Sequence, residues 1–466
     1  MSIIYKRPNL IAADPIRPLY NVGMGFDIPT GHYVKGLYGE HILNGGLSPL
    51  TGIAAMPNYF KTAMMLHFML SVMAAFKGTT AGSYDTESTL TENRVTQLAS
   101  HFPELEATDL FEADNMRFMI TNKDRYLGDE WFDEIKTFMM DKRKNKKGQL
   151  LRSPFPDRDG VSNLMMMTPD VFGADSLTEF MTSGVAETLD KYGLSDGKRN
   201  MTAMNNGRAK AAMISELSQI ASGSACPTIL AAHIGDKISI DGAPVEKVMQ
   251  YLKQGTKILG VTGKFMYLTN NCWFIAKANK YVNINTKGAE LPRAGETNVK
   301  DETDLVELTV VNLRGKAGCA GVPMTVLASQ EEGILSSLTE FQSLRDNAYY
   351  GLDGGNQNYV SCLMPDIKLS RTTVRGKLDE SPALRRAINI TSEMRQIERF
   401  MGRQYADYLC TPQHLFKTLK EKGYDWDQLL ATRGVWTTDN DKQDTHYLST
   451  LDLLRMAKDE YKPYWI

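Results

Sequence analysis

Cysteine is scarce in this 466-residue chain, and the five cysteines are odd in number and far apart. No two of them form a CxxC pair, so the sequence offers neither a disulfide framework nor a cysteine-based zinc site. This usage is typical of a reducing compartment, and we expect a cytoplasmic protein. The cysteines are Cys226, Cys272, Cys319, Cys362 and Cys410.

The sequence also lacks a long hydrophobic run and a strong charge of one sign. Its most apolar stretch, 62–76, is too short to cross a bilayer and contains His67, so no membrane span is expected. The first residues show no basic segment followed by an apolar one, as a signal peptide would. The formal net charge is -2, so any contact with nucleic acid must come from local basic patches.

What is present indicates a large folded protein. Hydrophobic residues make up 42% of the chain and charged residues 23%, which is near the average for globular proteins. Between residues 30 and 335, short apolar runs alternate with amphipathic stretches. This alternation predicts an α/β fold in which helices flank a central, mostly parallel sheet.

Three further segments stand apart from this predicted core. Residues 1–29 contain four prolines and predict an extended arm that docks on a neighbouring subunit. Residues 125–160 are rich in charge and turns and predict an inserted hairpin, whose basic run at 142–147 we expect to be solvated. Residues 336–466 predict a small, mainly helical C-terminal domain.

The C-terminal prediction depends on three helix-start signals. Ser381 and Thr411 are each followed by proline, the order expected for an N-cap and the first helical residue. Ser449 with Asp452 has the pattern of a capping box.

Residues 50–65, LTGIAAMPNYFKTAMM, have the pattern of a strand, a turn-rich loop and the start of a helix. A phosphate-binding loop needs backbone N–H groups at a helix N-terminus, a lysine for the phosphate oxygens and a hydroxyl for Mg²⁺. Lys61 and Thr62 supply the last two. Ala55 and Phe60 occupy the two glycine positions of GxxxxGK[ST], so the alternative is a helix that begins after Pro57 with an incidental Lys-Thr. The predicted phosphate-binding residues are Ala55, Met56, Pro57, Asn58, Tyr59, Phe60, Lys61 and Thr62.

Two later segments end apolar strands in carboxylates, where ligands bind in open α/β sheets. In AGSYDTE, 81–87, Glu87 would activate the attacking water and Asp85 would support it. In VFGADSL, 171–177, Asp175 would join Thr62 in holding Mg²⁺. The alternatives are a solvated acidic turn for the first segment and an ordinary buried strand for the second.

The order of these three segments resembles the core of the RecA family. An aromatic residue before Lys-Thr, here Phe60, resembles phage recombinases of the UvsX type, whose loops also lack the second glycine, whereas Ala55 departs from the family. The resemblance implies ATP and Mg²⁺ as cofactors and Glu87 as the catalytic glutamate. It also aligns TILAAHI, 228–234, with the strand that ends in a γ-phosphate sensor, which falls on His233. The alternative for His233 is a core histidine at a strand end.

The same resemblance implies DNA-binding loops at about 192–207 and 235–263, the second of which would close on a strand at GKFMYLTN. The alternative is a pair of ordinary surface loops. In VVNLRGKAGCAGVPMTVLASQEEGI, 310–334, two basic residues would act on the ATP of a neighbouring subunit, or else form a plain basic turn. The residues concerned are Arg208, Lys210, Lys264 and Phe265 for DNA, and Arg314 and Lys316 for the neighbour's ATP.

The function implied is an ATP-dependent recombinase that forms filaments on single-stranded DNA, pairs it with a homologous duplex and exchanges strands. Loader or single-strand-binding proteins would be further partners, and the location would be the bacterial host cytoplasm if the chain is phage-encoded. One alternative is a DnaB-type hexameric replicative helicase, and another is a non-hydrolysing DNA-binding scaffold with a degenerate loop. The prediction requires residues 61, 87 and 175 to converge at one edge of the sheet.

Overall fold

The computed structural model describes most of the chain. The residues it describes are 16–122, 126–192, 199–236, 249–293, 303–316, 320–355, 358–439 and 445–466, with the side chains of 199–203 left aside.

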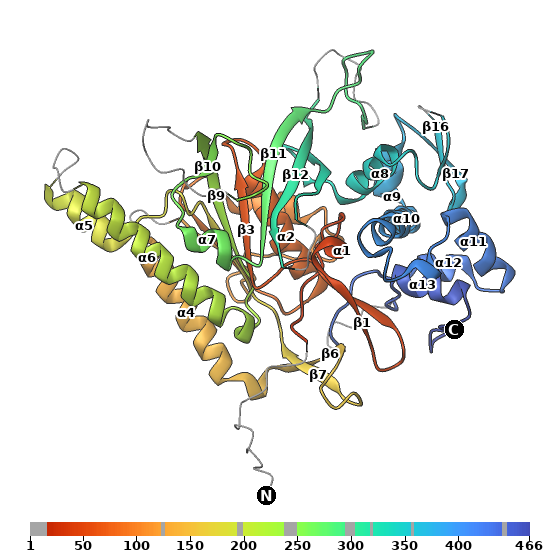
Figure 1. Ribbon diagram of the computed structural model, residues 1–466, viewed down its shortest axis with the longest axis horizontal. Helices are drawn as coiled ribbons and strands as arrows, with labels where there is room; N and C mark the ends of the chain where they lie inside the picture. Colours follow the sequence, from red (N-terminus) through yellow and green to blue (C-terminus); the bar gives the residue numbers. More distant parts are fainter. Residues whose placement is uncertain are drawn as a thin grey trace, which may run out of the picture.

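A ten-stranded sheet forms the centre of the molecule (Figure 1). From β11 to β5 in the order below, neighbouring strands run parallel, whereas β12, β13, β14 and β10 pair in antiparallel fashion. The predicted α/β class with a mostly parallel central sheet is therefore confirmed. In spatial order the strands are β14 (Gly333–Ile334), β13 (Pro323–Ser329), β12 (Leu305–Gly315), β11 (Asn271–Lys280), β3 (Leu50–Ala55), β9 (Thr228–Asp236), β8 (Val171–Asp175), β4 (Ala81–Asp85) and β5 (Phe118–Thr121), with β10 (Thr256–Ile258) paired to β9.

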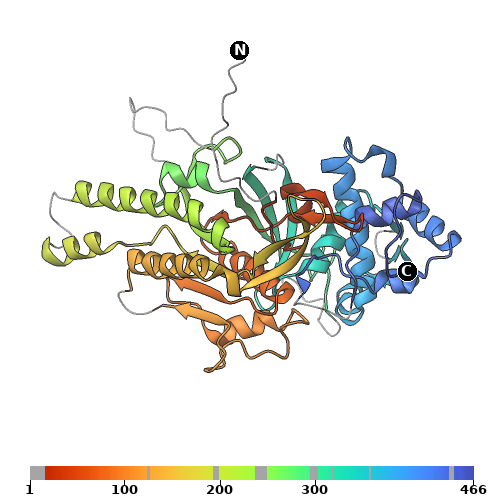
Figure 2. The same ribbon diagram turned by 90° about the horizontal axis from the view of Figure 1, so that it is seen from below.

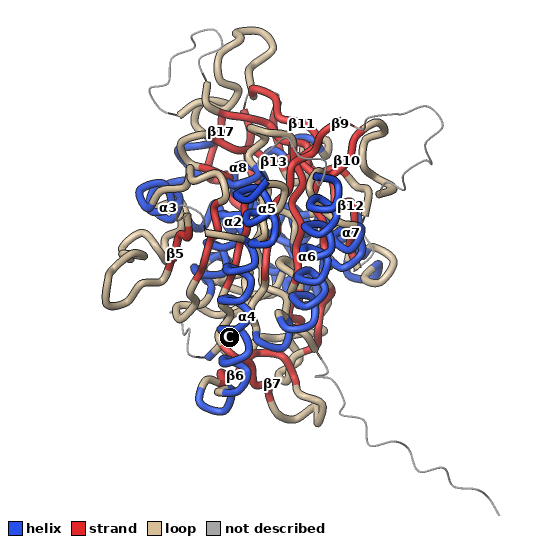
Figure 3. Tube along the Cα trace, turned by 90° about the vertical axis from the view of Figure 1, so that its left-hand side faces the viewer, coloured by secondary structure: helices blue, strands red, loops and turns tan. Residues whose placement is uncertain are grey.

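Helices cover both faces of this sheet. Helices α2 (Lys61–Ala75) and α3 (Glu92–Ala99) bury their apolar side chains against one face. On the other face lie α4 (Gly128–Lys144), α6 (Arg199–Ile220) and α7 (Gly263–Leu268), and α5 (Ser183–Tyr192) packs on α6. Figures 2 and 3 show α4 and α6 side by side on that face. Among the described helices, none has the length and apolar character that a bilayer span requires.

The central strands are apolar because both of their faces are covered. Ile53 of β3 points into the core on the α2 side, whereas its neighbour Ala54 packs on the α4 and α6 side. Ile229 and Leu230 of β9 divide between the two cores in the same way. This arrangement fixes the register of the strands, because a slip by one residue would exchange the two buried sets.

Residues 16–29 pack on this chain's own core, in contrast to the predicted arm on a neighbouring subunit. Tyr20, Val22, Met24 and Phe26 are buried in the same cluster as α2. The segment is not one extended strand, because Gly23, Met24 and Gly25 have positive φ and form a turn. The segment continues through α1 (Asp27–Thr30) into the hairpin of β1 (His32–Lys35) and β2 (His41–Asn44). Residues 1–15 lie outside the described residues.

The first half of the predicted hairpin at 125–160 is instead helix α4. A hairpin follows it, formed by β6 (Leu150–Pro156) and β7 (Asn163–Met167) after the short 3₁₀ turn Lys146–Gly148. The basic run is not wholly solvated, since Lys142 is buried and its ammonium lies 2.5 Å from the Asp170 carboxylate. Sequence alone could not show this pairing because the partner is 28 residues away.

The C-terminal region contains the predicted helices and one unpredicted sheet. Ser381, Thr411 and Ser449 each accept a hydrogen bond from a backbone N–H of the first helical turn, which confirms the three N-caps. The Asp452 carboxylate accepts instead from the His41 N–H and from Arg455, so only the N-cap half of the predicted capping box forms. The helices are α8 (Ser336–Asp346), α9 (Val374–Glu380), α10 (Pro382–Met401), α11 (Pro412–Glu421), α12 (Trp426–Leu430) and α13 (Thr450–Ala457), and the sheet consists of β15 (Leu352–Gly354), β16 (Asn358–Ser361) and β17 (Met364–Ser370).

Three carboxyl groups are buried where the N-terminal segment meets these helices. They belong to Asp27 of α1, Glu340 of α8 and Glu393 of α10, and desolvation raises the pKa of each. For Glu340 the pKa rises to about 8, with Glu393 adding to the effect while Asn389 and Arg386 oppose it. A carboxyl that is protonated in the folded state and ionised in the unfolded state makes stability depend on pH.

We predict that the protein loses stability as the pH rises from about 4.5 to about 8. In this range the unfolded chain releases the Glu340 proton while the folded chain retains it, so the loss is on the order of a few kcal/mol. Glu340→Gln should flatten this dependence, as measured by urea unfolding at pH 5 and pH 8.5. The exposed Glu421→Gln serves as the control. An equal slope for wild type and Glu340→Gln would contradict the assignment.

Candidate nucleotide-binding site

The loop between β3 and α2 has the strand–loop–helix form predicted for phosphate binding. Ala55, at the first glycine position of the motif, is the buried last residue of β3 and pairs with Ile275 and His233 of the adjacent strands. It has no positive φ, so no glycine is required there. Phe60, at the second glycine position, has φ 59° and ψ 24°, the left-handed conformation that glycine adopts at the lowest cost.

The N-terminus of α2 presents its backbone donors at the end of this loop. Phe60 provides no side-chain cap, and the first turn contains no acidic residue. The N–H of Met64 donates to the Phe60 carbonyl over 2.9 Å, so the amides of Lys61, Thr62 and Ala63 precede the first bond of the helix. These groups and the helix dipole favour an anion here. Pro57 removes one further donor from the loop.

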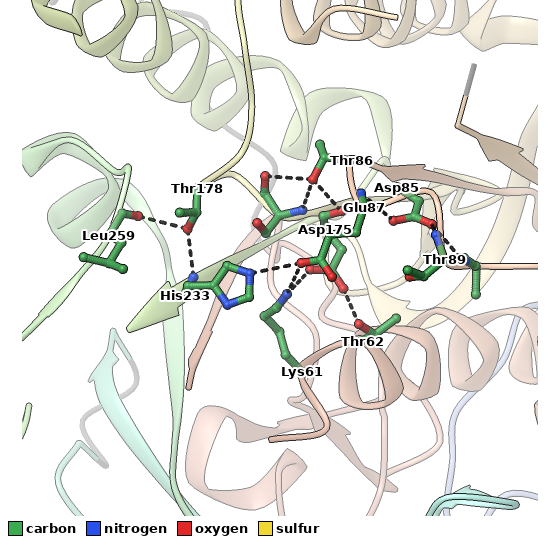
Figure 4. A network of polar contacts seen from close by, with 12 residues as sticks. Lys61, Thr62, Asp85, Thr86, Glu87, Thr89, Asp175, Thr178, His233 and Leu259 are labelled. Carbon is green, nitrogen blue, oxygen red and sulfur yellow. Dashed lines mark hydrogen bonds and ion pairs between the residues drawn. The ribbon is translucent and has the colours of Figure 1, made fainter. Parts of the chain in front are cut away.

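Lys61 is the central cation of the site (Figure 4). Its side chain is buried, and the ammonium forms an ion pair with Asp175 Oδ1 and lies 3.6 Å from Glu87 Oε1. The Thr62 hydroxyl donates to the other oxygen of Asp175. The structure thus brings together the three positions, 61, 87 and 175, on which the sequence argument depends.

Strand order explains this convergence. Strand β9 lies between β3 and β8, and β4 lies beyond β8. These four strands are parallel, so their carboxyl ends meet at the same edge of the sheet. The edge therefore receives the loop after β3, Asp175 from β8 and Glu87 from the turn after β4.

His233 joins the cluster from β9. Its Nε2 lies 3.0 Å from Glu87 Oε1. Its backbone N–H donates over 2.9 Å to the Thr178 hydroxyl, which in turn donates to the Leu259 carbonyl over 3.1 Å. His233 therefore lies within β9, level with the last residue of β3, and contacts the candidate catalytic carboxylate.

The turn that carries Glu87 is held by Asp85. The buried carboxylate of Asp85 accepts from the N–H groups of Glu87, Thr89 and Leu90 at 3.0, 2.6 and 2.6 Å. Asp85 therefore fixes the backbone of the turn, and its supporting role in water activation stays a prediction. Glu87 itself is 41% exposed, so solvent reaches its carboxylate.

Sequence reasoning missed two threonines that fasten this edge. Thr86 donates its backbone N–H to the Asp175 carbonyl over 2.8 Å, and its hydroxyl accepts from the N–H of Ser176 at the same distance. Thr178 links β9 to the segment after β10, as described above. The position of Thr86 between two singled-out acids could have indicated it, whereas no sequence signal indicates Thr178.

Two of the four candidate DNA-contacting residues are buried, which contradicts their prediction. Phe265 lies in the core between α7 and the sheet, and the Lys210 ammonium donates to backbone carbonyls. The Lys264 ammonium donates to the Ser215 hydroxyl over 2.6 Å, and Arg208 is exposed on α6. GKFMYL forms helix α7 instead of the predicted strand, which explains why Phe265 points inward.

The two candidate DNA loops are only partly described. Helix α6 begins at Arg199, so the second half of the predicted loop 192–207 is helical, and residues 193–198 lie outside the described residues. In the segment 235–263, β10 pairs with β9 to form a hairpin, and residues 237–248 lie outside the described residues.

Arg314 and Lys316 lie at the opposite edge of the sheet from Lys61. Strand β12 is antiparallel to β11, and its Gly315 is level with Asn271, which pairs with Thr51 near the start of β3. The Arg314 guanidinium donates to the Met266 carbonyl over 3.1 Å, and Lys316 is exposed. Both therefore lie away from the candidate nucleotide site of their own chain.

The donor set is compatible with a magnesium ion bound together with a nucleotide. Thr62 and Asp175 offer a hydroxyl and a carboxylate side by side, the hard oxygen ligands that Mg²⁺ takes. The described residues contain no group of three or more His, Cys, Asp or Glu side chains that could hold a metal unaided. Nucleotide-bound Mg²⁺ needs no such group, because phosphates and water complete its shell.

Neither a family model nor a curated protein matches the sequence. Among the solved structures that match is the crystal structure of the RadB recombinase, with 15% sequence identity and a TM-score of 0.32. The match covers 63% of this chain and 93% of that chain. A likeness at this level carries no argument about function, which must come from the residues at the sheet edge.

The left-handed backbone at Phe60 gives a prediction about stability. Phe60→Gly and Phe60→Ala both remove the ring, but only glycine takes this conformation without strain, so the glycine variant should be more stable by about 1 kcal/mol. Chemical denaturation of both variants measures the difference.

Position 71, which lies inside α2, provides the matched control. Alanine favours a helix interior more than glycine does, so Ser71→Ala should be more stable than Ser71→Gly. If the alanine variant were the more stable one at position 60 as well as at position 71, the backbone at position 60 would not be left-handed.

Proposed function

We propose that this chain is a DNA-dependent ATPase of the RecA class that acts as a recombinase. The observation that carries the proposal is the convergence of Lys61, Glu87 and Asp175 at the carboxyl edge of a mostly parallel sheet. A cation, an open carboxylate and a carboxylate–hydroxyl pair are the groups that phosphoryl transfer from a nucleotide requires.

Each group then has a role that follows from its position. Lys61 and the α2 amides would bind the phosphates, and Thr62 with Asp175 would hold Mg²⁺, which neutralises phosphate charge when bound. Glu87 would take a proton from the attacking water, since it is exposed and held on a fixed turn. His233 would respond to the γ-phosphate through its contact with Glu87.

The DNA part of the proposal is supported by fewer residues. Of the predicted contacts, Arg208 remains exposed on α6, and Lys264 lies on the neighbouring helix α7. Both flank the segments proposed as DNA loops. Their positive charges would contact the phosphate backbone, which all DNA sequences share, as strand exchange requires.

Two alternative functions remain. A hexameric helicase would use the same nucleotide site and differ in how neighbouring subunits close. A non-hydrolysing scaffold is favoured by the departures at Ala55 and Phe60. The structure weakens that argument, since Ala55 needs no glycine and Phe60 adopts the conformation that glycine would take.

Glu87→Gln should separate hydrolysis from binding. Loss of the base should lower ATP turnover by about 100-fold or more, because general bases contribute at least this much. Affinity for a fluorescent ATP analogue should change less than fivefold, since Lys61, Thr62 and Asp175 remain. Turnover is measured with and without single-stranded DNA.

The exposed Glu92→Gln on α3 is the matched control and should turn over like wild type. Equal turnover for wild type and Glu87→Gln would exclude Glu87 as the base, and no turnover at all would favour the scaffold. Electron microscopy with single-stranded DNA and a slowly hydrolysed ATP analogue distinguishes the assemblies. Filaments are expected, and six-fold rings would favour the helicase.

A further inference from the structure

Lys210 is a buried cation on α6 that lies beside the candidate site without belonging to it. Only 3% of the residue is exposed. Its ammonium donates to the carbonyl oxygens of Leu177, Thr178 and Gly260 at 2.7, 3.3 and 3.0 Å. These three bonds use all the donors of the ammonium, so the side chain is fixed in one position.

The carbonyl oxygens belong to two segments that end at the candidate site. Leu177 and Thr178 are two and three residues after Asp175, and Gly260 is two residues after the end of strand β10. The two segments touch closely, since a Cβ on Gly260 would lie 2.7 Å from the Thr178 Cα. Lys210 therefore joins three parts of the chain: helix α6, the end of β8 and the end of the β9–β10 hairpin.

Thr178 connects this junction to the candidate catalytic carboxylate. Its hydroxyl accepts from the backbone N–H of His233, and the His233 ring contacts Glu87. A continuous set of contacts thus runs from Glu87 through His233 and Thr178 to Lys210 (Figure 4 shows its first three members). A displacement of His233 must alter the Thr178 contacts on which Lys210 depends.

Burying this ammonium costs free energy, so a lysine at this position needs a reason other than packing. Its bonds go to neutral carbonyls, which compensate a buried charge less well than a carboxylate does. Desolvation lowers the Lys210 pKa to about 8, with Glu179 opposing the change. An apolar residue of similar length would fill this space without the cost, so packing alone does not explain a lysine here.

We propose that Lys210 is a positioning residue that couples the Glu87–His233 pair to α6 and to the β9–β10 hairpin, and so sets how strongly DNA stimulates ATP turnover. The inference rests on the proposed function, because it assigns a mode of regulation to the same site. Each coupled element overlaps one of the segments proposed to contact DNA, because α6 includes residues 199–207 and β10 lies within 235–263. Without the Lys210 bonds, the nucleotide site would remain assembled but would no longer respond to DNA.

Lys210→Met tests the coupling, because methionine keeps the length and removes the donors. The variant should bind a fluorescent ATP analogue within threefold of wild type and keep its basal turnover. Its stimulation by single-stranded DNA should fall tenfold or more. Lys210→Arg, which keeps a cation and several donors, should recover part of the stimulation. Thr178→Val, which removes the hydroxyl contact, should also reduce stimulation.

The control is Lys136→Met. Lys136 of α4 also contacts α6, through an ion pair with Glu216 at 2.5 Å. Neither residue belongs to the set of contacts that runs from Glu87 to Lys210. Lys136→Met should leave the stimulation unchanged. Thermal unfolding of each variant shows whether it is folded, and Thr178→Val provides the test if Lys210→Met is not.

The outcomes separate the two proposals. If wild type shows no ATP turnover or no stimulation by DNA, the proposed function fails and the coupling with it. If wild type is stimulated and Lys210→Met and Thr178→Val are stimulated equally well, only the coupling is overturned. Equal losses of basal and stimulated turnover would likewise overturn it, because they would show a structural role.

Discussion

The buried ammonium of Lys61 and the carboxylate of Asp175 form the interaction on which the candidate site depends. Neither side chain is exposed enough for water to solvate its charge, so each requires the other. Removing one partner of a buried pair leaves an uncompensated charge and typically costs about 3–5 kcal/mol. The pair also fixes the distance between the start of α2 and the end of β8, which are 114 residues apart in the chain.

This pairing has a consequence for nucleotide binding. Lys61 and Thr62 now contact Asp175. A triphosphate would need the Lys61 ammonium, and its Mg²⁺ would need the oxygens of Thr62 and Asp175, so both would replace these contacts. Binding would therefore exchange contacts within the site instead of adding contacts to a preformed cavity. Glu87 lies at the border of this exchange, 3.6 Å from Lys61 and 3.0 Å from His233. Its contact with His233 would therefore change if Lys61 turned toward a bound phosphate.

The residues of the site that come directly after a strand could be predicted from the sequence. Apolar runs that end in Glu87 and Asp175, and a loop that ends in Lys-Thr, could be placed at one edge because parallel strands share their direction. The apparent defect at Phe60 could not be judged from sequence, since only the backbone shows that this residue takes the conformation of glycine. The fold class followed from the same alternation of apolar runs and amphipathic stretches.

The sequence failed where burial decides the role of a residue. Lys210 and Phe265 are residue types that are common at DNA-contacting surfaces, yet both lie on the inward faces of their helices, α6 and α7, and are buried. Lys142 belongs to a basic run, yet it turns inward to Asp170. In each case the partner is distant in the chain or is a backbone carbonyl, so residue type and spacing contain no signal for it.

The placement of Arg314 and Lys316 limits how this molecule could use them. Strand β12 carries them to the edge of the sheet opposite Lys61, and the core packed on both faces separates the two edges. A role in phosphoryl transfer therefore requires the nucleotide of another subunit, bound against this far edge. Hydrolysis would then depend on assembly, because a single chain has its candidate base and candidate metal ligands at one edge and these two cations at the other. A filament and a ring both meet this condition, so the geometry of the subunit contact, and not the chemistry of the site, would distinguish a recombinase from a helicase.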